Sequence, residues 1–419
     1  MSNGATHLVE TGSVQSGLDR LAAGEGPDLS RCHVALLCHP ASVDKRIRHV
    51  TDIFHDLGVT VVSLLGPEHG IEAAAQDMAE VPGDPLLSPS QDAAYGPRTP
   101  QYSLYGKNAA SLRPTVDMFG DANWLVCDLQ DVGSRYYTYV WTAVMAAEVA
   151  LADGRNVLIL DRPNPIGGGD HSIEGATIET GFESFVGFHP VAVRHGMTLG
   201  ELTCMALAER GTSTRDRLKV LTCSGWRRDM LFPATGLRWV MPSPNMPTFD
   251  TAMVYPGQCL FEGTQLSEGR GTTRPFEIVG APWVDGRALA DAVTREERPG
   301  IVLRPLRFTP TFHKHVGITC GGVQLHVVDA NATRSLGTAV ALLRELWRQG
   351  AARRGANAFR WRTEPYEFVS DIPAVDLLAG GSWLREGIES GVPAPDLLAS
   401  QADARDAFIA RRRPFLVYD

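Results

Sequence analysis

Residues 124–137 read WLVCDLQDVGSRYY, and this stretch decides the fold. Its first part, Trp124–Leu129, is a short, continuous apolar run that suits a strand buried on both faces. Polar residues follow it at once. Three other runs have the same character, namely His33–Cys38, Val59–Leu65 and Asn156–Leu160. We therefore predict four parallel strands in one buried sheet.

Helical patterns lie between these strands. In 44–57, apolar residues recur on one stripe, and 138–152 is rich in alanine, which favours helix. Thr198 and Glu201 form a capping-box pattern that opens a helix over 199–209. The alternation of strands and helices predicts an α/β fold with a parallel sheet.

The second half of the chain differs in composition from the first. Trp, Pro and Gly become frequent after residue 224, and 322–329 and 336–348 read as a strand and a helix. The tail 401–419 is predicted as a helix followed by a short strand, PFLVY. The predicted domains are an N-terminal arm over 1–30, a catalytic domain over 31–240 and a C-terminal α/β domain over 241–419. The C-terminal domain comes with a loop-rich, cleft-forming segment over 240–286.

Composition excludes several classes of protein. The chain has 419 residues, of which 44% are hydrophobic and 21% charged, so it is not a disordered chain. The net charge of −9 argues against a nucleic-acid partner and against a polybasic membrane surface. Seven scattered cysteines without a CxxC pattern fit a reducing compartment. With no signal-peptide pattern and no long apolar stretch, the expected location is the cytoplasm.

Each predicted strand ends in a polar motif. These motifs are HPAS at 39–42, GPEHG at 66–70, DLQDVGSRYY at 128–137 and DRPNP at 161–165. In open α/β sheets, ligands bind outside the carboxyl ends of the strands. We therefore expect the four motifs to converge on one cleft.

Glu68 and His69 are the first candidate catalytic residues. Pro67 and Gly70 restrict the turn and hold both side chains in a defined loop. A carboxyl group above an apolar sheet end acquires a raised pKa and can serve as a general acid. The alternative is a carboxylate that only binds backbone amides at the start of the next helix.

The motifs after the third and fourth strands add further candidates. Asp131 is placed to face a ligand, and Arg135 suits a carboxylate or phosphate. Tyr137 is either part of a sugar-binding wall or part of the core. Asn164 between two prolines is a hydrogen-bonding group or a structural turn residue. His195, just before the capping box, binds substrate or caps structure.

The loop-rich middle supplies Ser243 and Asn245 in SPN, Glu262 in EGT, and Arg270 in SEGRGT, which suits an anionic group. No P-loop and no GxGxxG after a strand is present, so no nucleotide cofactor is predicted. HExxH and paired Cys/His spacings are also missing, which disfavours zinc. Magnesium is a second possibility, with the carboxylates Glu68, Asp128, Asp131 and Asp161 as ligands.

The motifs as a set resemble one family. In order, they are GPEHG, DLQDVG-R-YTY, DRPNP, EG at 174–175, SFVG at 184–187, HGMTLGEL, SPNMP, YPG, EGT and SEGRGT-PF. The chain resembles the exo-β-N-acetylmuramidases of the NamZ type, formerly a domain-of-unknown-function family, from about residue 14 to the C-terminus. It departs from the family pattern after PEH, where 70–73 read GIEA, at 39–42, and in 85–100.

The resemblance implies a Rossmann-like parallel-sheet domain followed by a smaller α/β domain. It implies release of terminal, non-reducing N-acetylmuramic acid from peptidoglycan fragments, with Glu68 as the catalytic carboxylate. The substrate would be a peptidoglycan-derived sugar or muropeptide, in cell-wall turnover.

Under this hypothesis Glu68 is the general acid, and the second carboxylate is Asp131, with Glu262 or Glu268 as alternatives. Arg135 or Arg270 meets the lactyl carboxylate. Contacts to sugar hydroxyl and acetamido groups are expected from His69, Tyr137, Asn164 and Asn245. The alternative functions are a magnesium-dependent hydrolase of a small anionic substrate and a non-catalytic cell-wall sugar-binding protein.

Overall fold

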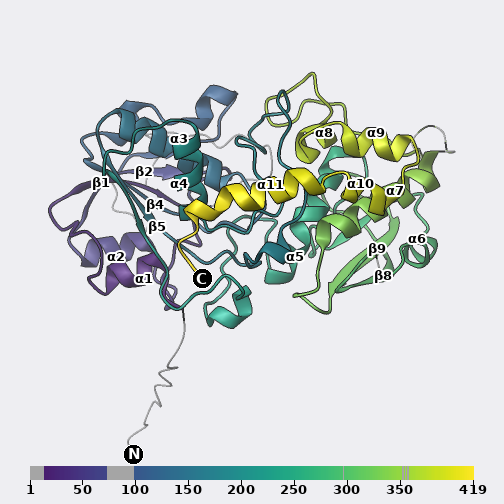
Figure 1. The fold of residues 1–419 in the computed structure, drawn as a ribbon, viewed down its shortest axis with the longest axis horizontal. Coiled ribbons are helices and arrows are strands. Elements are labelled where there is room, and N and C mark those ends of the chain that lie inside the picture. Colours follow the sequence, from purple (N-terminus) through teal and green to yellow (C-terminus); the bar gives the residue numbers. More distant parts are fainter. Residues whose placement is uncertain (1–13, 73–98, 296, 352, 354, 356–357) are drawn as a thin grey trace, which may run out of the picture.

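The structure is a computed structural model that describes residues 14–72, 99–295, 297–351, 353, 355 and 358–419. The first domain is built on six parallel strands in the order β3-β2-β1-β4-β5-β6, the order of a Rossmann fold (Figure 1). The strands are β1 (His33–Cys38), β2 (Thr60–Gly66), β3 (Gln101–Ser103), β4 (Trp124–Asp128), β5 (Asn156–Leu160) and β6 (Leu218–Leu221). The four predicted strands are confirmed as β1, β2, β4 and β5.

Both faces of this sheet are covered, which explains why its strands are continuous apolar runs. On β1, Ala35 and Leu37 pack with the helices α3 and α4, whereas Val34 and Leu36 pack with α1 and α2. The two pairs of helices lie on opposite sides of the sheet (Figure 1). The bounds of these helices are α1 (Gly17–Ala22), α2 (Val50–Asp56), α3 (Tyr139–Ala152) and α4 (Leu199–Glu209).

Two local predictions for this domain differ from the structure. The helix predicted over 44–57 begins only at Val50, because the Asp44 side chain accepts the backbone N–H groups of Arg46 and Arg48 and holds a turn there. Residues 14–30 are not a surface arm. They contain α1, which has a capping box, and Leu18 in it is fully buried against the sheet.

The second domain has a three-stranded antiparallel sheet in the order β7-β9-β8, with α5 and α6 packed against it and α7 packed against these two helices. The predicted strand at 322–329 and helix at 336–348 are confirmed as β9 and α7. The elements are α5 (Phe249–Gln258), β7 (Ile278–Ala281), α6 (Gly286–Ala292), β8 (Ile301–Phe308), β9 (Cys320–Val327), α7 (Ser335–Ala351), α8 (Ala374–Ala379), α9 (Trp383–Glu389), α10 (Ala394–Ala399) and α11 (Ala402–Arg412). Short 3-10 turns connect several of these elements, among them η5 (Cys259–Gly263).

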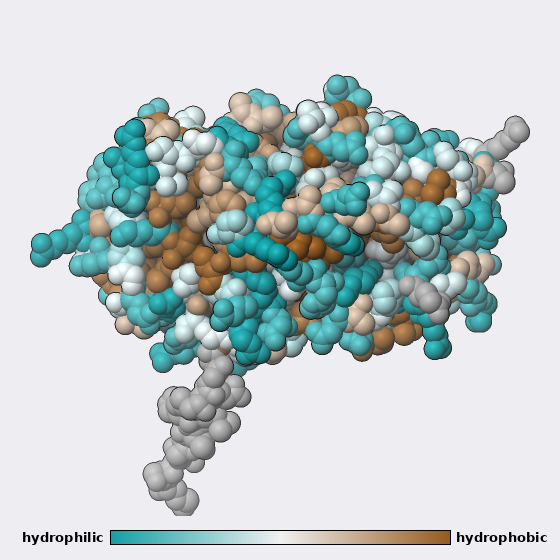
Figure 2. Space-filling view, in the orientation of Figure 1, coloured by the Kyte–Doolittle hydropathy of each residue, from teal (hydrophilic) through white to brown (hydrophobic). Residues whose placement is uncertain are grey.

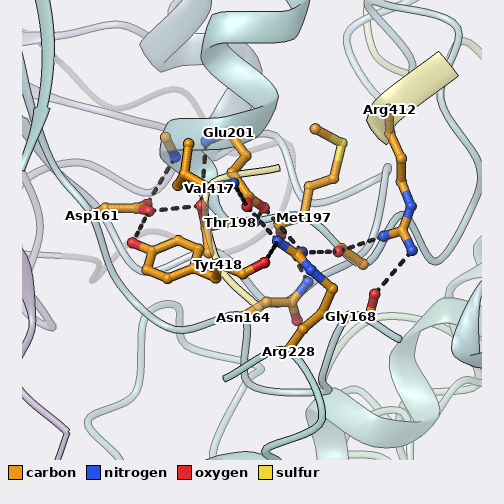
Figure 3. Close-up of polar contacts among 12 residues, drawn as sticks. Asp161, Asn164, Gly168, Met197, Thr198, Glu201, Arg228, Arg412, Val417 and Tyr418 are labelled. Atoms are coloured by element: carbon orange, nitrogen blue, oxygen red, sulfur yellow. Dashed lines mark hydrogen bonds and ion pairs between the residues drawn. The ribbon is translucent and has the colours of Figure 1, made fainter. Parts of the chain in front are cut away.

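The chain after α11 returns to the first domain (Figure 1). The short strand predicted in PFLVY is wrong, because the tail is held by side chains and not by a sheet neighbour. The Tyr418 hydroxyl donates to Asp161, the Val417 N–H donates to Glu201, and Arg228 donates to the Tyr418 carbonyl (Figure 3). The tail therefore joins the two domains.

Hydrophilic side chains cover much of the face shown in Figure 2, with apolar side chains gathered in smaller patches between them. Among the helices of the described ranges, none combines the length and apolar character needed to cross a bilayer.

Candidate functional site

A narrow polar pocket lies where the two domains meet, beyond the carboxyl ends of β2 and β4. The first domain contributes the loop after β2 and the segment leading into α3, and the second contributes α5, η5 and the loops around them. The lining residues are Glu68, His69, Tyr136, Tyr137, Thr138, Tyr139, Val186, Ser243, Asn245, Met246, Tyr255, Glu262, Arg270, Phe276, Tyr366 and Glu367.

The GPEHG turn aims Glu68 into the pocket. Gly66 ends β2 so close to the next segment that a Cβ there would lie 2.6 Å from the Ile71 backbone nitrogen, so no larger residue fits. The Gly70 N–H closes the turn on the Pro67 carbonyl at 2.9 Å, and His69 takes a left-handed φ of 71°. Such strain in a non-glycine residue is typical of functional loops.

The Glu68 carboxyl group is buried, with 6% of the residue exposed. Its Oε2 accepts a 2.7 Å hydrogen bond from the Thr138 hydroxyl at the start of α3. Burial raises the pKa of Glu68 to about 7, Thr138 and Arg270 oppose the rise, and the Glu262 charge adds to it. A carboxyl group with this pKa carries a proton at neutral pH in a large fraction of molecules, as a general acid must.

Glu262 is the second carboxylate in the pocket, and it is firmly held. Its Oε1 is ion-paired with Arg270 at 2.6 Å, and its Oε2 accepts a 2.6 Å hydrogen bond from the Tyr366 hydroxyl. Arg270 also lies 3.4 Å from Glu268. Among the carboxyl groups of the pocket, Glu68 thus has a raised pKa and Glu262 is held by an arginine.

Glu268 lies behind this pair and does not line the pocket. Its carboxylate contacts Lys314 at 2.8 Å and His313 at 3.2 Å, and the residue is fully buried. Burial alone would raise the pKa of Glu268, but the Lys314 ammonium, the His313 bond and the Arg270 guanidinium hold that pKa well below its usual range. Glu268 is therefore an anion that supports Arg270 from outside the pocket.

Seven of the residues predicted from the sequence come together here. They derive from motifs far apart in the chain and line one pocket: Glu68, His69, Tyr137, Ser243, Asn245, Glu262 and Arg270.

The structure does not bring Asp131 and His195 to the pocket lining. Asp131 accepts the Gly133 N–H at 2.6 Å and lies 3.4 Å from His195, whose other ring nitrogen accepts the Met197 N–H. Both are buried, and Asp131 orders the loop after β4.

Arg135 and Asn164 also lie away from the pocket lining. The fully buried guanidinium of Arg135 donates to the carbonyls of Ala176, Val191 and Leu378, and burial lowers its pKa to about 10. Asn164 donates to the Met197 carbonyl and accepts the Ile166 N–H, as a turn residue does. Backbone groups are the hydrogen-bond partners shown for both side chains, and neither side chain lines the pocket.

Several lining residues were not predicted from the sequence: Thr138, Tyr255, Met246, Phe276, Tyr366 and Glu367. Tyr255 and Phe276 stand within the YPG and SEGRGT-PF motifs, which marked their segments. Tyr366 and Glu367 stand in PYEF at 365–368, which carries no glycine or asparagine to signal its turn.

The acids considered as magnesium ligands are otherwise engaged. Asp128 forms a bidentate ion pair with Arg162, and Asp161 accepts from Thr198, Gly200 and Tyr418. Within the part of the chain that the structure describes, no three His, Cys, Asp or Glu side chains are grouped so as to hold a metal ion.

The fold and the site define a two-domain α/β protein in which carboxyl groups from both domains share one pocket. The family model described as exo-beta-N-acetylmuramidase NamZ, N-terminal, matches residues 34–250, and its C-terminal counterpart matches residues 253–418. The chain belongs to this NamZ family.

A curated relative and two solved structures extend this result. The peptidoglycan beta-N-acetylmuramidase NamZ of Bacillus subtilis (strain 168) is 37% identical over 406 residues, which are 97% of this chain and 91% of the relative. A DUF1343 family protein from Bacteroides fragilis superposes with a TM-score of 0.84 at 30% identity, covering 98% of this chain and 100% of the other. A second protein of that family and organism gives 0.72 at 26% identity, covering 97% and 99%.

Proposed function

We propose that this protein is an exo-acting glycoside hydrolase that releases terminal, non-reducing N-acetylmuramic acid from peptidoglycan fragments. The observation that carries the proposal is the raised pKa of Glu68 in a pocket that also holds the ion-paired Glu262. Glycosidases of the common kind need one protonated and one ionised carboxyl group beside the scissile bond. The substrate class comes from the family and from the name of the Bacillus subtilis relative.

In this mechanism Glu68 gives its proton to the oxygen of the leaving group as the glycosidic bond breaks. A water molecule finally supplies the hydroxyl group at the anomeric carbon, so one water is consumed for each bond cleaved. Glu262 is preferred to Asp131 as the second carboxylate, because Glu262 lines the pocket and Asp131 does not.

The other lining groups suit a carboxylated amino sugar. Arg270 is the cation of the pocket closest to the paired acids and is our candidate partner of the lactyl carboxylate. His69, Tyr137, Ser243 and Asn245 carry hydrogen-bonding groups for hydroxyl and acetamido positions. The tyrosine rings give an apolar wall against which a sugar face packs.

The test is the Glu68→Gln variant, assayed on a disaccharide with N-acetylmuramic acid at its non-reducing end, because a chromogenic aryl glycoside has an activated leaving group that departs without a proton. We expect kcat to fall by at least about a thousandfold, because an amide cannot donate the proton, while the melting temperature stays near that of the wild type. Glu72→Gln is the matched control, since Glu72 is exposed and stands four residues further on.

Retained turnover by Glu68→Gln would contradict the role of this residue. Saturable binding of the sugar without cleavage of even the activated glycoside by the wild type would instead favour a non-catalytic binding protein.

A further inference from the structure

A strained two-residue turn at Glu367 and Phe368 borders the pocket. Tyr366 and Val369 exchange two backbone hydrogen bonds of 2.9 Å, and between them Glu367 has a φ of 47° and Phe368 a φ of 68°. A turn with two left-handed residues normally uses asparagine or glycine, because a Cβ is crowded in that conformation. Backbone strain of this kind persists only where surrounding contacts enforce it, and it concentrates at functional sites.

The turn delivers two side chains to the pocket. The Tyr366 hydroxyl donates to Glu262, and Glu367 lines the pocket with only 3% of the residue exposed. From the first domain, the Tyr105 hydroxyl donates to Glu367 Oε2 at 3.2 Å, and its ring lies 5.4 Å from that of Phe368. Contacts from both domains therefore hold a third carboxylate in the same pocket as Glu68.

The surroundings of Glu367 point to substrate binding and not to proton transfer. Glu262 and Arg270 are the charged groups that shift the pKa of Glu68. Glu68 and Glu262 already provide the acid and the ionised carboxylate of the proposed mechanism. A carboxylate only accepts hydrogen bonds, and a sugar offers hydroxyl groups as donors. A buried carboxylate that loses such a donor suffers a large penalty, so it discriminates strongly between sugars that have the hydroxyl group and sugars that lack it.

We propose that Glu367 is a specificity-determining residue that accepts a hydrogen bond from a free hydroxyl group at the non-reducing end of the terminal sugar. The inference rests on the proposed function and deepens it. In an internal sugar of a glycan chain, the oxygen through which the chain continues is part of a glycosidic bond and carries no proton. Such a sugar offers Glu367 no hydrogen at that oxygen, and this favours binding of the chain end.

Three variants separate the carboxylate from the turn. In Glu367→Gln, the charge is lost at constant length, and KM for the aryl muramic glycoside is expected to rise at least tenfold. Glu367→Asn also removes the charge but places a residue that tolerates positive φ, so KM rises similarly while the melting temperature stays equal to or above that of the wild type. Glu364→Gln, an exposed position three residues earlier, is the matched control and leaves both quantities unchanged.

A modified substrate tests the hydroxyl contact directly. With the 4-O-methyl form of the glycoside, the wild type is expected to show a KM at least tenfold higher than with the free form. In Glu367→Gln, this ratio narrows to below about threefold, because an amide N–H can donate to an ether oxygen. A wild-type KM in Glu367→Asn, or an unchanged ratio in Glu367→Gln, would overturn the inference.

A binding measurement distinguishes failure of this inference from failure of the proposed function. If the wild type does not cleave the glycoside, the hydrolase proposal fails, and calorimetric binding of N-acetylmuramic acid tests Glu367 alone. An affinity at least tenfold weaker in Glu367→Gln supports the contact, and equal affinities refute it.

Discussion

At the scale of single residues, the protonation of Glu68 controls the chemistry. Burial raises the pKa of this carboxyl group to about 7, and the Thr138 hydroxyl limits the rise by stabilising the ionised form. A general acid works only while protonated, so turnover falls as the pH rises through this pKa. The alkaline limb of the pH profile is therefore expected near pH 7.

Replacement of Thr138 by valine keeps the shape and removes the hydrogen bond to Glu68. Since that bond favours the charged form, its loss raises the pKa further, and the alkaline limb of kcat/KM moves up by about one pH unit. The measurement is a pH profile of kcat/KM. Thr142→Val, the same change one helical turn further along α3, leaves the limb in place because Thr142 bonds only the Thr138 carbonyl. A limb that moves down or stays put in Thr138→Val contradicts the assignment.

Some pocket residues were predictable from the sequence because their motifs restrict the backbone. GPEHG encloses Glu68 and His69 between proline and glycine, and the polar motifs around Asn245 and Arg270 have no place in a packed element. Arg135 and Asn164 carry the same guanidinium and amide groups as Arg270 and Asn245, yet they donate hydrogen bonds to backbone carbonyls. Which partner a buried polar group finds depends on segments far away in the chain, so local sequence does not decide it.

At the scale of elements, the loop 309–319 between β8 and β9 supports the pocket from behind. Its Lys314 ammonium donates to Glu268 and to the carbonyls of Phe261 and Leu266 on the segments that carry Glu262 and Arg270. The hairpin thus holds the acidic and basic groups of η5 and the SEGRGT loop in place.

In Lys314→Met, the buried Glu268 keeps Arg270 and His313 as its ionic partners among the described residues. We expect a loss of about 2 kcal/mol in the free energy of unfolding, since a buried anion loses its nearest cation. Urea unfolding at pH 7 measures it. Because the folded-state pKa of Glu268 is depressed, the stabilisation is present at neutral pH and is lost as the pH falls below the ordinary glutamate range.

Arg307→Met on the exposed face of β8 is the control for this change, with an expected effect within about 0.5 kcal/mol. Equal stabilities of the two variants at pH 7 would show that Lys314 does not hold the loop.

In the first domain, the strands that the sequence predicts are those covered on both faces, because they are continuous apolar runs. Two of the strands that it misses have other patterns. In β8, exposed residues such as Val302 and Arg304 alternate with buried ones, and β3 has only three half-buried residues. The Tyr366–Val369 turn is not predicted from the sequence, because tertiary contacts, and not its own residue types, impose its conformation.

At the scale of the whole molecule, side-chain bonds between distant segments join the domains. Arg135 reaches the Leu378 carbonyl in α8, and Arg412 in α11 donates to the His195, Gly196 and Gly168 carbonyls. These pairs are more than 200 residues apart in sequence and leave no local pattern. The sequence therefore predicts the two domains more readily than it predicts how they meet.

The tail offers a test of this junction. Tyr418→Phe removes a hydroxyl group that donates to Asp161 at 2.6 Å (Figure 3). The same hydroxyl group accepts the Cys223 N–H at 2.8 Å. We expect the free energy of unfolding to fall by about 1–2 kcal/mol at pH 8, because a buried carboxylate loses a donor. Val417→Ala, at an exposed side chain, is the control and stays within about 0.5 kcal/mol.

The pH dependence separates loss of the bond to Asp161 from loss of the bond to the Cys223 N–H. Burial raises the pKa of Asp161 to about 6, whereas the Tyr418 bond lowers it, so the bond matters most when the carboxylate is charged. The destabilisation by Tyr418→Phe is therefore expected to be larger at pH 8 than at pH 5, as measured by urea unfolding at the two values. Since no residue of this network lines the pocket in the described ranges, kcat/KM for the aryl glycoside should stay within about twofold of the wild type. A cost that is independent of pH would mean that the lost bond to the Cys223 N–H, and not the bond to Asp161, accounts for the destabilisation.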